Sequence, residues 1–172
     1  YETGLKFDAE RFHSQVSAWY TELEDNILRT ENVEGLFQRS NRDSCLLGSE
    51  WYGEYLFTPR WSLYGNFAYV WGQDLVRHEP LSRVPPAQGL IGTRLRSEDH
   101  RRWLDLFAWL VAKQDRLNFQ DTTDARIQPA GYQTLNLRAG VTLGQKYNHT
   151  LSITLENLTD QAYRVHGSGV DG

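Results

Sequence analysis

The stretch Gln133-Thr-Leu-Asn-Leu-Arg-Ala-Gly-Val-Thr-Leu143 decides the fold class of this chain. Every second residue from Leu135 to Leu143 is apolar, and the residues between them are polar or glycine. Alternate side chains of a β-strand point to opposite faces, so this pattern predicts a strand with one apolar and one polar face.

The same alternation recurs on both sides of this stretch and predicts an all-β chain. Residues 103–112 are almost continuously apolar, and periodicity alone does not separate a buried helix from a strand there. We interpret the segment as a strand. The charged Asp105 then indicates that the face it shares with Trp103, Phe107 and Trp109, every second residue of the segment, points inward. Eight strands are predicted, at about 1–7, 12–23, 49–57, 61–72, 88–96, 102–113, 132–143 and 150–158.

The links between these strands alternate in length. Short links are predicted at 8–11, 58–60, 97–101 and 144–149, and long ones at about 24–47, 73–86 and 114–131. Antiparallel strands joined by alternately short and long links are typical of an outer-membrane barrel, with tight periplasmic turns and long extracellular loops. Several strands have the roughly 9–11 residues that cross a bilayer when tilted. A soluble β-sandwich has the same local pattern and remains the alternative.

Composition narrows the function classes. The formal net charge of −4 and the pI near 5.7 argue against a nucleic-acid binder. The single cysteine, Cys45, excludes an internal disulfide and a cysteine-based zinc site. His78 and His100 have no partner at metal-ligand spacing, so no metal site is predicted. The chain has no Met and opens on Tyr1 in mid-pattern, so we expect a piece of a longer protein.

The C-terminal third resembles a known family. The stretch Pro129-Ala-Gly-Tyr-Gln-Thr-Leu-Asn-Leu-Arg-Ala-Gly140, followed by Leu151-Ser-Ile-Thr-Leu-Glu-Asn-Leu-Thr-Asp-Gln-Ala-Tyr-Arg164, resembles the C-terminal barrel of TonB-dependent outer-membrane receptors. Asn157-Leu-Thr-Asp160 with Tyr163 matches the family's pattern near its last strands. The segments 18–27, 48–50 and 84–86 extend the resemblance over nearly the whole chain.

The resemblance implies a fold and a function. Residues 1–172 would form the C-terminal portion of an antiparallel transmembrane β-barrel, about eight strands of 22, with the plug domain and the last strand absent. The function would be TonB-driven uptake of an iron-siderophore, haem, vitamin or similar scarce ligand across the outer membrane of a Gram-negative bacterium. The partners would be outer-membrane lipid, the protein's own N-terminal plug, TonB through segments outside this chain, and a small-molecule ligand. No cofactor, nucleic acid or enzymatic activity is implied.

Two sets of side chains are candidates for function. Long loops on a rigid barrel are natural sites of ligand recognition, and arginine offers a forked donor to anionic chelates. Charges are costly on a lipid face near mid-bilayer, so charged residues on the polar parity should line the lumen or meet the plug, unless they pair with one another and only stabilise the wall. The loop candidates lie around Arg39, Asn41 and Arg42, and at Arg77, His78, Arg116, Asp121, Asp124, Arg126, Arg164 and His166; the lumen candidates are Glu50, Glu54, Arg94, Arg96, Asn136, Arg138 and Glu156.

Two other membrane barrels stay open as alternatives. Eight strands is the smallest closed barrel, so a small structural or adhesive outer-membrane barrel fits the strand count. Its lumen must be filled by side chains, yet several residues of the polar parity are small, among them Gly72, Gly92 and Gly140. A barrel enzyme is disfavoured, because the sequence has no credible Ser/His or Asp/His constellation.

Overall fold

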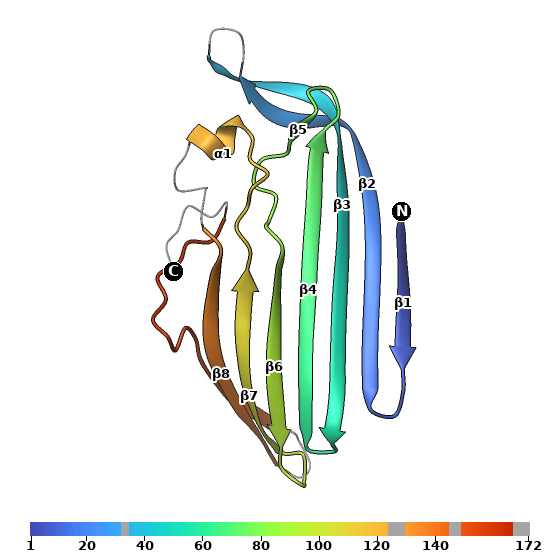
Figure 1. Cartoon of the computed structure of the whole chain (residues 1–172), viewed down its shortest axis with the longest axis vertical. Helices are drawn as coiled ribbons and strands as arrows, with labels where there is room; N and C mark the ends of the chain where they lie inside the picture. The colour runs from blue at the N-terminus through green and yellow to red at the C-terminus, as the bar shows by residue number, and fades with distance from the viewer. Residues whose placement is uncertain (32–34, 124–129, 145–148, 167–172) are drawn as a thin grey trace.

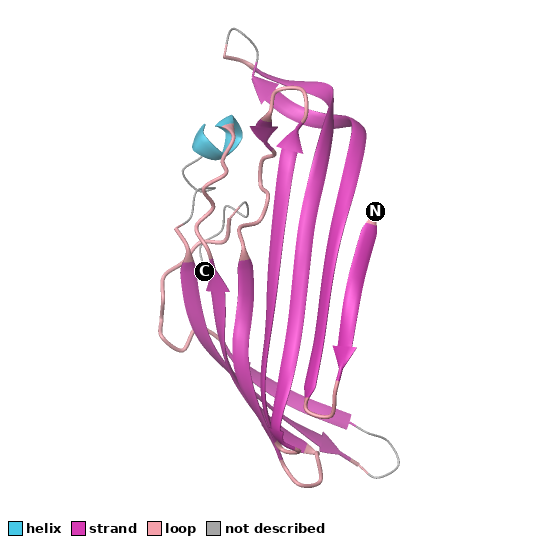
Figure 2. Ribbon diagram, turned by 45° about the vertical axis from the view of Figure 1, so that its right-hand side comes forward, coloured by secondary structure: helices cyan, strands magenta, loops and turns pink. Residues whose placement is uncertain are grey.

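In the part of the chain that the structure describes, the strands form one antiparallel β-sheet, accompanied by one short helix (Figures 1 and 2). The computed structural model describes all residues except 32–34, 124–129, 145–148 and 167–172. The strands run along the long axis of the molecule (Figure 1). The elements are β1 (Glu2–Asp8), β2 (Phe12–Glu31), β3 (Phe37–Thr58), β4 (Trp61–Asp74), β5 (Glu79–Pro80), β6 (Gln88–Arg96), β7 (Arg102–Val111), α1 (Phe119–Thr123), β8 (Tyr132–Leu143) and β9 (His149–Leu155).

Neighbouring strands in the sheet are also neighbours along the chain. The order is β1-β2-β3-β4-β6-β7-β8-β9, and the two-residue β5 pairs with the end of β4. Every pairing is antiparallel. Strands β1 and β9 lie at opposite edges, so the sheet is open within the described residues. The predicted all-β antiparallel wall is confirmed. Over the same residues, no helix has the length and apolar character needed to span a membrane.

One predicted long link is wrong. The predicted bounds of β6 and β8 agree with the structure, but residues 24–31 and 37–47 of this link belong to strands β2 and β3. Strands β2 and β3 continue their pairing up to Glu31 and Phe37. The register shifts between Leu23 and Asn26, where Asp25 has a φ of 50°. Beyond this bulge the hairpin bends over the end of the sheet (Figure 1). Beyond Asn26 most residues of both strands are polar, so the apolar alternation ends before the strands do.

The sheet has one apolar and one polar face. The pairings Val16–Trp51–Phe67–Gly89 and Ser17–Glu50–Ala68–Gln88 show that each parity runs unbroken across strands. A soluble sandwich would cover the apolar face with a second sheet, but all described strands belong to one sheet. Large side chains are therefore exposed along the apolar face, among them Leu5, Phe7, Val16, Trp51, Tyr55, Phe57, Trp61, Leu63, Phe67, Tyr69, Ile91, Leu95, Leu104, Leu106, Leu110, Leu151, Ile153 and Leu155.

Two indole N–H groups on the apolar face have hydrogen-bond partners on neighbouring strands. The indole Nε1 of Trp51 donates to Ser14 Oγ at 3.0 Å, and that of Trp61 donates to Thr93 Oγ1 at 2.7 Å. A donor without a partner is costly in an apolar environment, so these bonds suit a face covered by hydrocarbon.

Candidate functional site

A cluster of ionic side chains lies on the polar face near the end of the sheet with short hairpins. Arg94, Asp105 and Arg138 are direct cross-strand partners on β6, β7 and β8. Arg94 binds both carboxylate oxygens of Asp105, with its Nε at 2.6 Å and its Nη2 at 2.8 Å. Arg138 Nη2 reaches the same carboxylate at 3.0 Å. Asp105 is completely buried, so one carboxylate ties three strands together.

Aromatic rings enclose this cluster. The Arg94 guanidinium lies 5.1 Å from the ring centroid of Tyr64 and 5.8 Å from that of Trp103. Arg138 lies 5.5 Å from the Trp103 ring and 5.7 Å from the Phe107 ring. These are cation–π distances, so the rings stabilise the two guanidinium groups beyond what Asp105 supplies.

Two glycines make room for these rings. A Cβ at Gly140 would lie 2.5 Å from the Trp103 ring, and one at Gly92 would lie 2.6 Å from Phe107 Cβ. Gly92 and Gly140 therefore leave space for aromatic side chains, whereas a Cβ at Gly72 would meet the aliphatic side chains of Val84, Leu46 and Leu81. These glycines do not leave an empty lumen-facing surface.

A second ionic pair continues the polar face. Arg96 Nη2 lies 3.6 Å from Glu54 Oε1, and the Tyr52 hydroxyl donates to Glu54 Oε2 at 3.1 Å. Asn136 is buried, and its amide oxygen accepts a hydrogen bond from the backbone N–H of Asn157. Four of the charged lumen candidates thus have ionic partners within the wall.

Glu50 and Glu156 differ from those four residues. Both lie on the polar parity and are exposed, and neither has an ionic partner among the described residues. They are the candidates free to meet another part of the protein.

At the long-loop end, Asp121 joins two connections. Its Oδ1 accepts from Ser82 Oγ at 2.7 Å and from the backbone N–H of Arg83 at 3.3 Å, and its Oδ2 accepts from Asn118 N at 3.2 Å. Gln114 Nε2 adds a bond to Val84 O at 2.8 Å. Asp121 is fully buried, so this predicted ligand residue is an internal anchor for two loops.

The other loop candidates are dispersed. Arg77 and His78 are exposed on the turn after β4, where Asp74 accepts from Arg77 N at 3.0 Å and Asp74 O accepts from His78 N at 2.9 Å. Arg116 stacks 4.4 Å from the Trp71 ring centroid. Arg164 and His166 lie partly buried beyond β9. Arg39, Asn41 and Arg42 lie on β3, and Arg42 forms an ion pair with Asp74. Asp124 and Arg126 fall outside the described residues.

A hollow of about 680 Å³ lies beneath the bent hairpin. Its apolar lining includes Ile27, Leu81 and Phe119, from the hairpin, the β5 segment and α1. Asp74 and Arg83 contribute charged groups to the same lining. None of these five residues was a sequence candidate, because they come from segments that are distant in the sequence.

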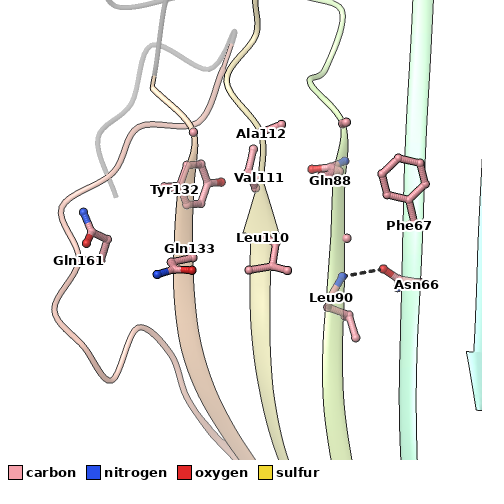
Figure 3. Close-up of a pocket in the computed structure, with 13 residues that line it drawn as sticks. Asn66, Phe67, Gln88, Leu90, Leu110, Val111, Ala112, Tyr132, Gln133 and Gln161 are labelled. Atoms are coloured by element: carbon pink, nitrogen blue, oxygen red, sulfur yellow. Dashed lines mark hydrogen bonds between the residues drawn. The ribbon is translucent and has the colours of Figure 1, made fainter.

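A neutral hollow of about 690 Å³ lies where β6 begins and β7 ends (Figure 3). Asn66, Gln88, Gln133 and Gln161 place amide groups in its lining, and Asn66 Oδ1 accepts from Leu90 N at 3.1 Å. The lining has no ionisable group except the Tyr132 phenol, so it offers hydrogen bonds without charge.

The family is decided by the match of a sequence model. The model of the TonB-dependent receptor-like β-barrel covers residues 1–158. The chain belongs to the TonB-dependent receptor β-barrel family. No curated protein sequence matches this chain.

Solved structures agree with this fold. The copper transporter OprC is similar at a TM-score of 0.81 and 23% identity, with 96% of this chain and 26% of that chain covered. The FrpB iron transporter of Neisseria meningitidis has a TM-score of 0.70 and 11% identity, with 99% of this chain and 29% of that chain covered. The ferric yersiniabactin uptake receptor FyuA of Yersinia pestis has a TM-score of 0.65 and 20% identity, with 99% of this chain and 26% of that chain covered. The chain therefore spans between a quarter and a third of the length of these receptors.

Proposed function

We propose that this chain is the barrel portion of a Gram-negative outer-membrane receptor that takes up a scarce ligand with energy from TonB. The observation that carries the proposal is the division of one sheet into an exposed apolar face and a polar face that bears buried ion pairs. In a barrel wall the apolar face meets lipid and the polar face meets the lumen. The open sheet edges disfavour the small closed eight-stranded barrel.

The ligand class that fits best is an anionic metal chelate. Soft Cys and Met ligands select copper, but the chain has no Met, and Cys45 is buried. Within the described residues, no three Cys, His, Asp or Glu side chains form a metal-binding group. Arg77 and Arg83 are exposed at the long-loop end, where their forked donors suit carboxylates or catecholates of an iron-siderophore. Solved relatives include receptors for ferric siderophores.

We propose that the hollow beneath the bent hairpin contributes to ligand binding. It combines apolar walls with Arg83 and Asp74 at the end of the sheet that would face the medium. Pockets with an apolar lining and a few placed polar groups are the usual form of small-molecule sites.

The test uses the full-length receptor in cells that make no siderophore of their own. Uptake of radiolabelled iron from a panel of ferric siderophores should require TonB. Arg83→Ala and Ile27→Ala should weaken binding of the transported chelate by about tenfold, the loss expected for one charged hydrogen bond or one apolar contact. Arg60→Ala, at the opposite end of the sheet, is the matched control. Wild-type affinity in both hollow variants would place recognition elsewhere.

The polar face is proposed to hold the plug through Glu50 and Glu156. Arg94, Arg96, Arg138 and Glu54 already have ionic partners in the wall, so their first role is to stabilise it. Replacing Glu50 and Glu156 by Gln should loosen the plug and raise the entry of a large antibiotic that the intact membrane excludes. Unchanged antibiotic sensitivity in the double variant would contradict plug contact at these positions.

A further inference from the structure

A third hollow, of about 850 Å³, lies on the apolar face at the end of the sheet with short hairpins. A direct cross-strand row, Leu95–Leu104–Ala139–Ile153, passes through it on β6, β7, β8 and β9. Ala139 carries only a methyl group between the longer Leu104 and Ile153 side chains. The surface is therefore recessed there, and its walls are almost entirely apolar.

A cationic side chain stands at the rim of this hollow. Arg102 begins β7 and pairs with Val141, a residue of the apolar parity, so its side chain leaves the sheet on the same face as the hollow. Arg102 is exposed, and among the described residues its guanidinium forms no hydrogen bond and no ion pair within 4 Å, although its charge attracts the Asp99 carboxylate at longer range. Ser97 lies beside it in the lining.

The acidic residues of the neighbouring turn are already engaged. Glu98 binds Arg60 Nη1 at 2.8 Å. Asp99 accepts from the Ser97 hydroxyl and, at 3.0 Å, from the backbone N–H of Arg101. The Ser97 hydrogen bond is the main cause that lowers the pKa of the Asp99 carboxyl, so Asp99 is ionised at neutral pH. Arg60, Arg101 and Arg102 together outnumber these two acids, which leaves the turn with a positive charge in excess.

We propose that this hollow binds an anionic phospholipid, with an acyl chain against Ala139 and the phosphodiester and headgroup at Arg102. The proposal rests on the membrane placement proposed above, which puts the short hairpins in the periplasmic leaflet, where phospholipid headgroups are at the same level as Arg102. An apolar recess ending at an exposed cation matches the two parts of that molecule. Basic sites at membrane surfaces select anionic headgroups in this way.

The test measures lipid retention directly. The full-length receptor is mixed in mild detergent with equimolar phosphatidylglycerol and phosphatidylethanolamine of the same acyl chains, and bound lipid is counted by native mass spectrometry. Phosphatidylglycerol should be retained about fivefold better, the preference expected for one surface arginine. Arg102→Gln should abolish this preference, and Arg102→Lys should keep it. Arg60→Gln, whose guanidinium is paired with Glu98, is the matched control and should also keep it.

A variant of the recess separates the acyl chain from the headgroup. Ala139→Leu fills the hollow and should reduce retention of both lipids, whereas a site for the phosphate alone would be unaffected. In the wild-type receptor, added salt should lower the preference for phosphatidylglycerol. The proposal is overturned if Arg102→Gln keeps the preference for phosphatidylglycerol, as Arg60→Gln should, or if Ala139→Leu retains both lipids at the wild-type level. It is also overturned if the effect of Ala139→Leu is to dissociate a dimer of the receptor. Because retention is scored on folded receptor without ligand uptake, failure here leaves the transport proposal standing.

Discussion

Replacing Asp105 by Asn should destabilise the barrel wall more than any change to an exposed charge. Asp105 is completely buried, while the side chains of Arg94 and Arg138 are 28% and 40% exposed. The Asn side chain has the same shape but only one acceptor oxygen, whereas the two carboxylate oxygens of Asp105 accept three hydrogen bonds from the arginines. Removing one partner of a buried pair costs about 3–5 kcal/mol. Partial hydration of both arginines and their aromatic neighbours places the expected loss near the lower limit, at about 3 kcal/mol.

The measurement is equilibrium unfolding of the full-length receptor in lipid vesicles by guanidinium. Asp99→Asn, in the exposed turn, is the matched control and should change the free energy of unfolding by less than about 0.5 kcal/mol. Arg94→Gln should cost more than Arg138→Gln, because Arg94 makes two bonds to the carboxylate and Arg138 makes one. Equal stabilities of Asp105→Asn and Asp99→Asn would refute the idea that this carboxylate holds the three strands together.

Three further changes test the geometry elsewhere. Gly140→Val would drive a side chain into the Trp103 ring and should cost about 1–3 kcal/mol in the same unfolding assay, whereas Ala139→Val on the opposite face should be nearly neutral. Asp121→Asn should speed amide hydrogen exchange in residues 79–87 and 114–123 together; faster exchange in one segment only would contradict a shared anchor. Asn157 has a φ of 53° and bonds twice to Gln161, so Asn157→Ala should cost about 1–2 kcal/mol, and Asn157→Gly, which tolerates this φ, should recover part of it.

The strand pattern could be predicted from the sequence wherever one face meets an apolar environment. Strands β6 and β8 have the predicted bounds, because Ile91 and Leu137 belong to unbroken apolar parities. The outer halves of β2 and β3 could not be predicted, since beyond Asp25 most of their residues are polar on both parities and leave no periodic signal.

The site was less predictable than the strands. Asp105 gave a usable signal as the one acid inside an apolar run, although its ionic role depends on Arg94 and Arg138, far from it in the sequence. Asp121 was selected as a loop residue exposed to ligand, but its burial depends on Ser82, a residue of the preceding long connection. Contacts between segments that are distant in sequence leave no local pattern.

The shared anchor at Asp121 has a consequence for the exchange of loops between receptors. A chimaera that receives a foreign connection between β4 and β6 would lose Ser82 and Arg83 while keeping the carboxylate that they bind. One that receives a foreign connection between β7 and β8 would lose the carboxylate and leave Ser82 without its acceptor. The two connections therefore form one transplantable unit, and we expect a change of ligand preference to require that both be exchanged together.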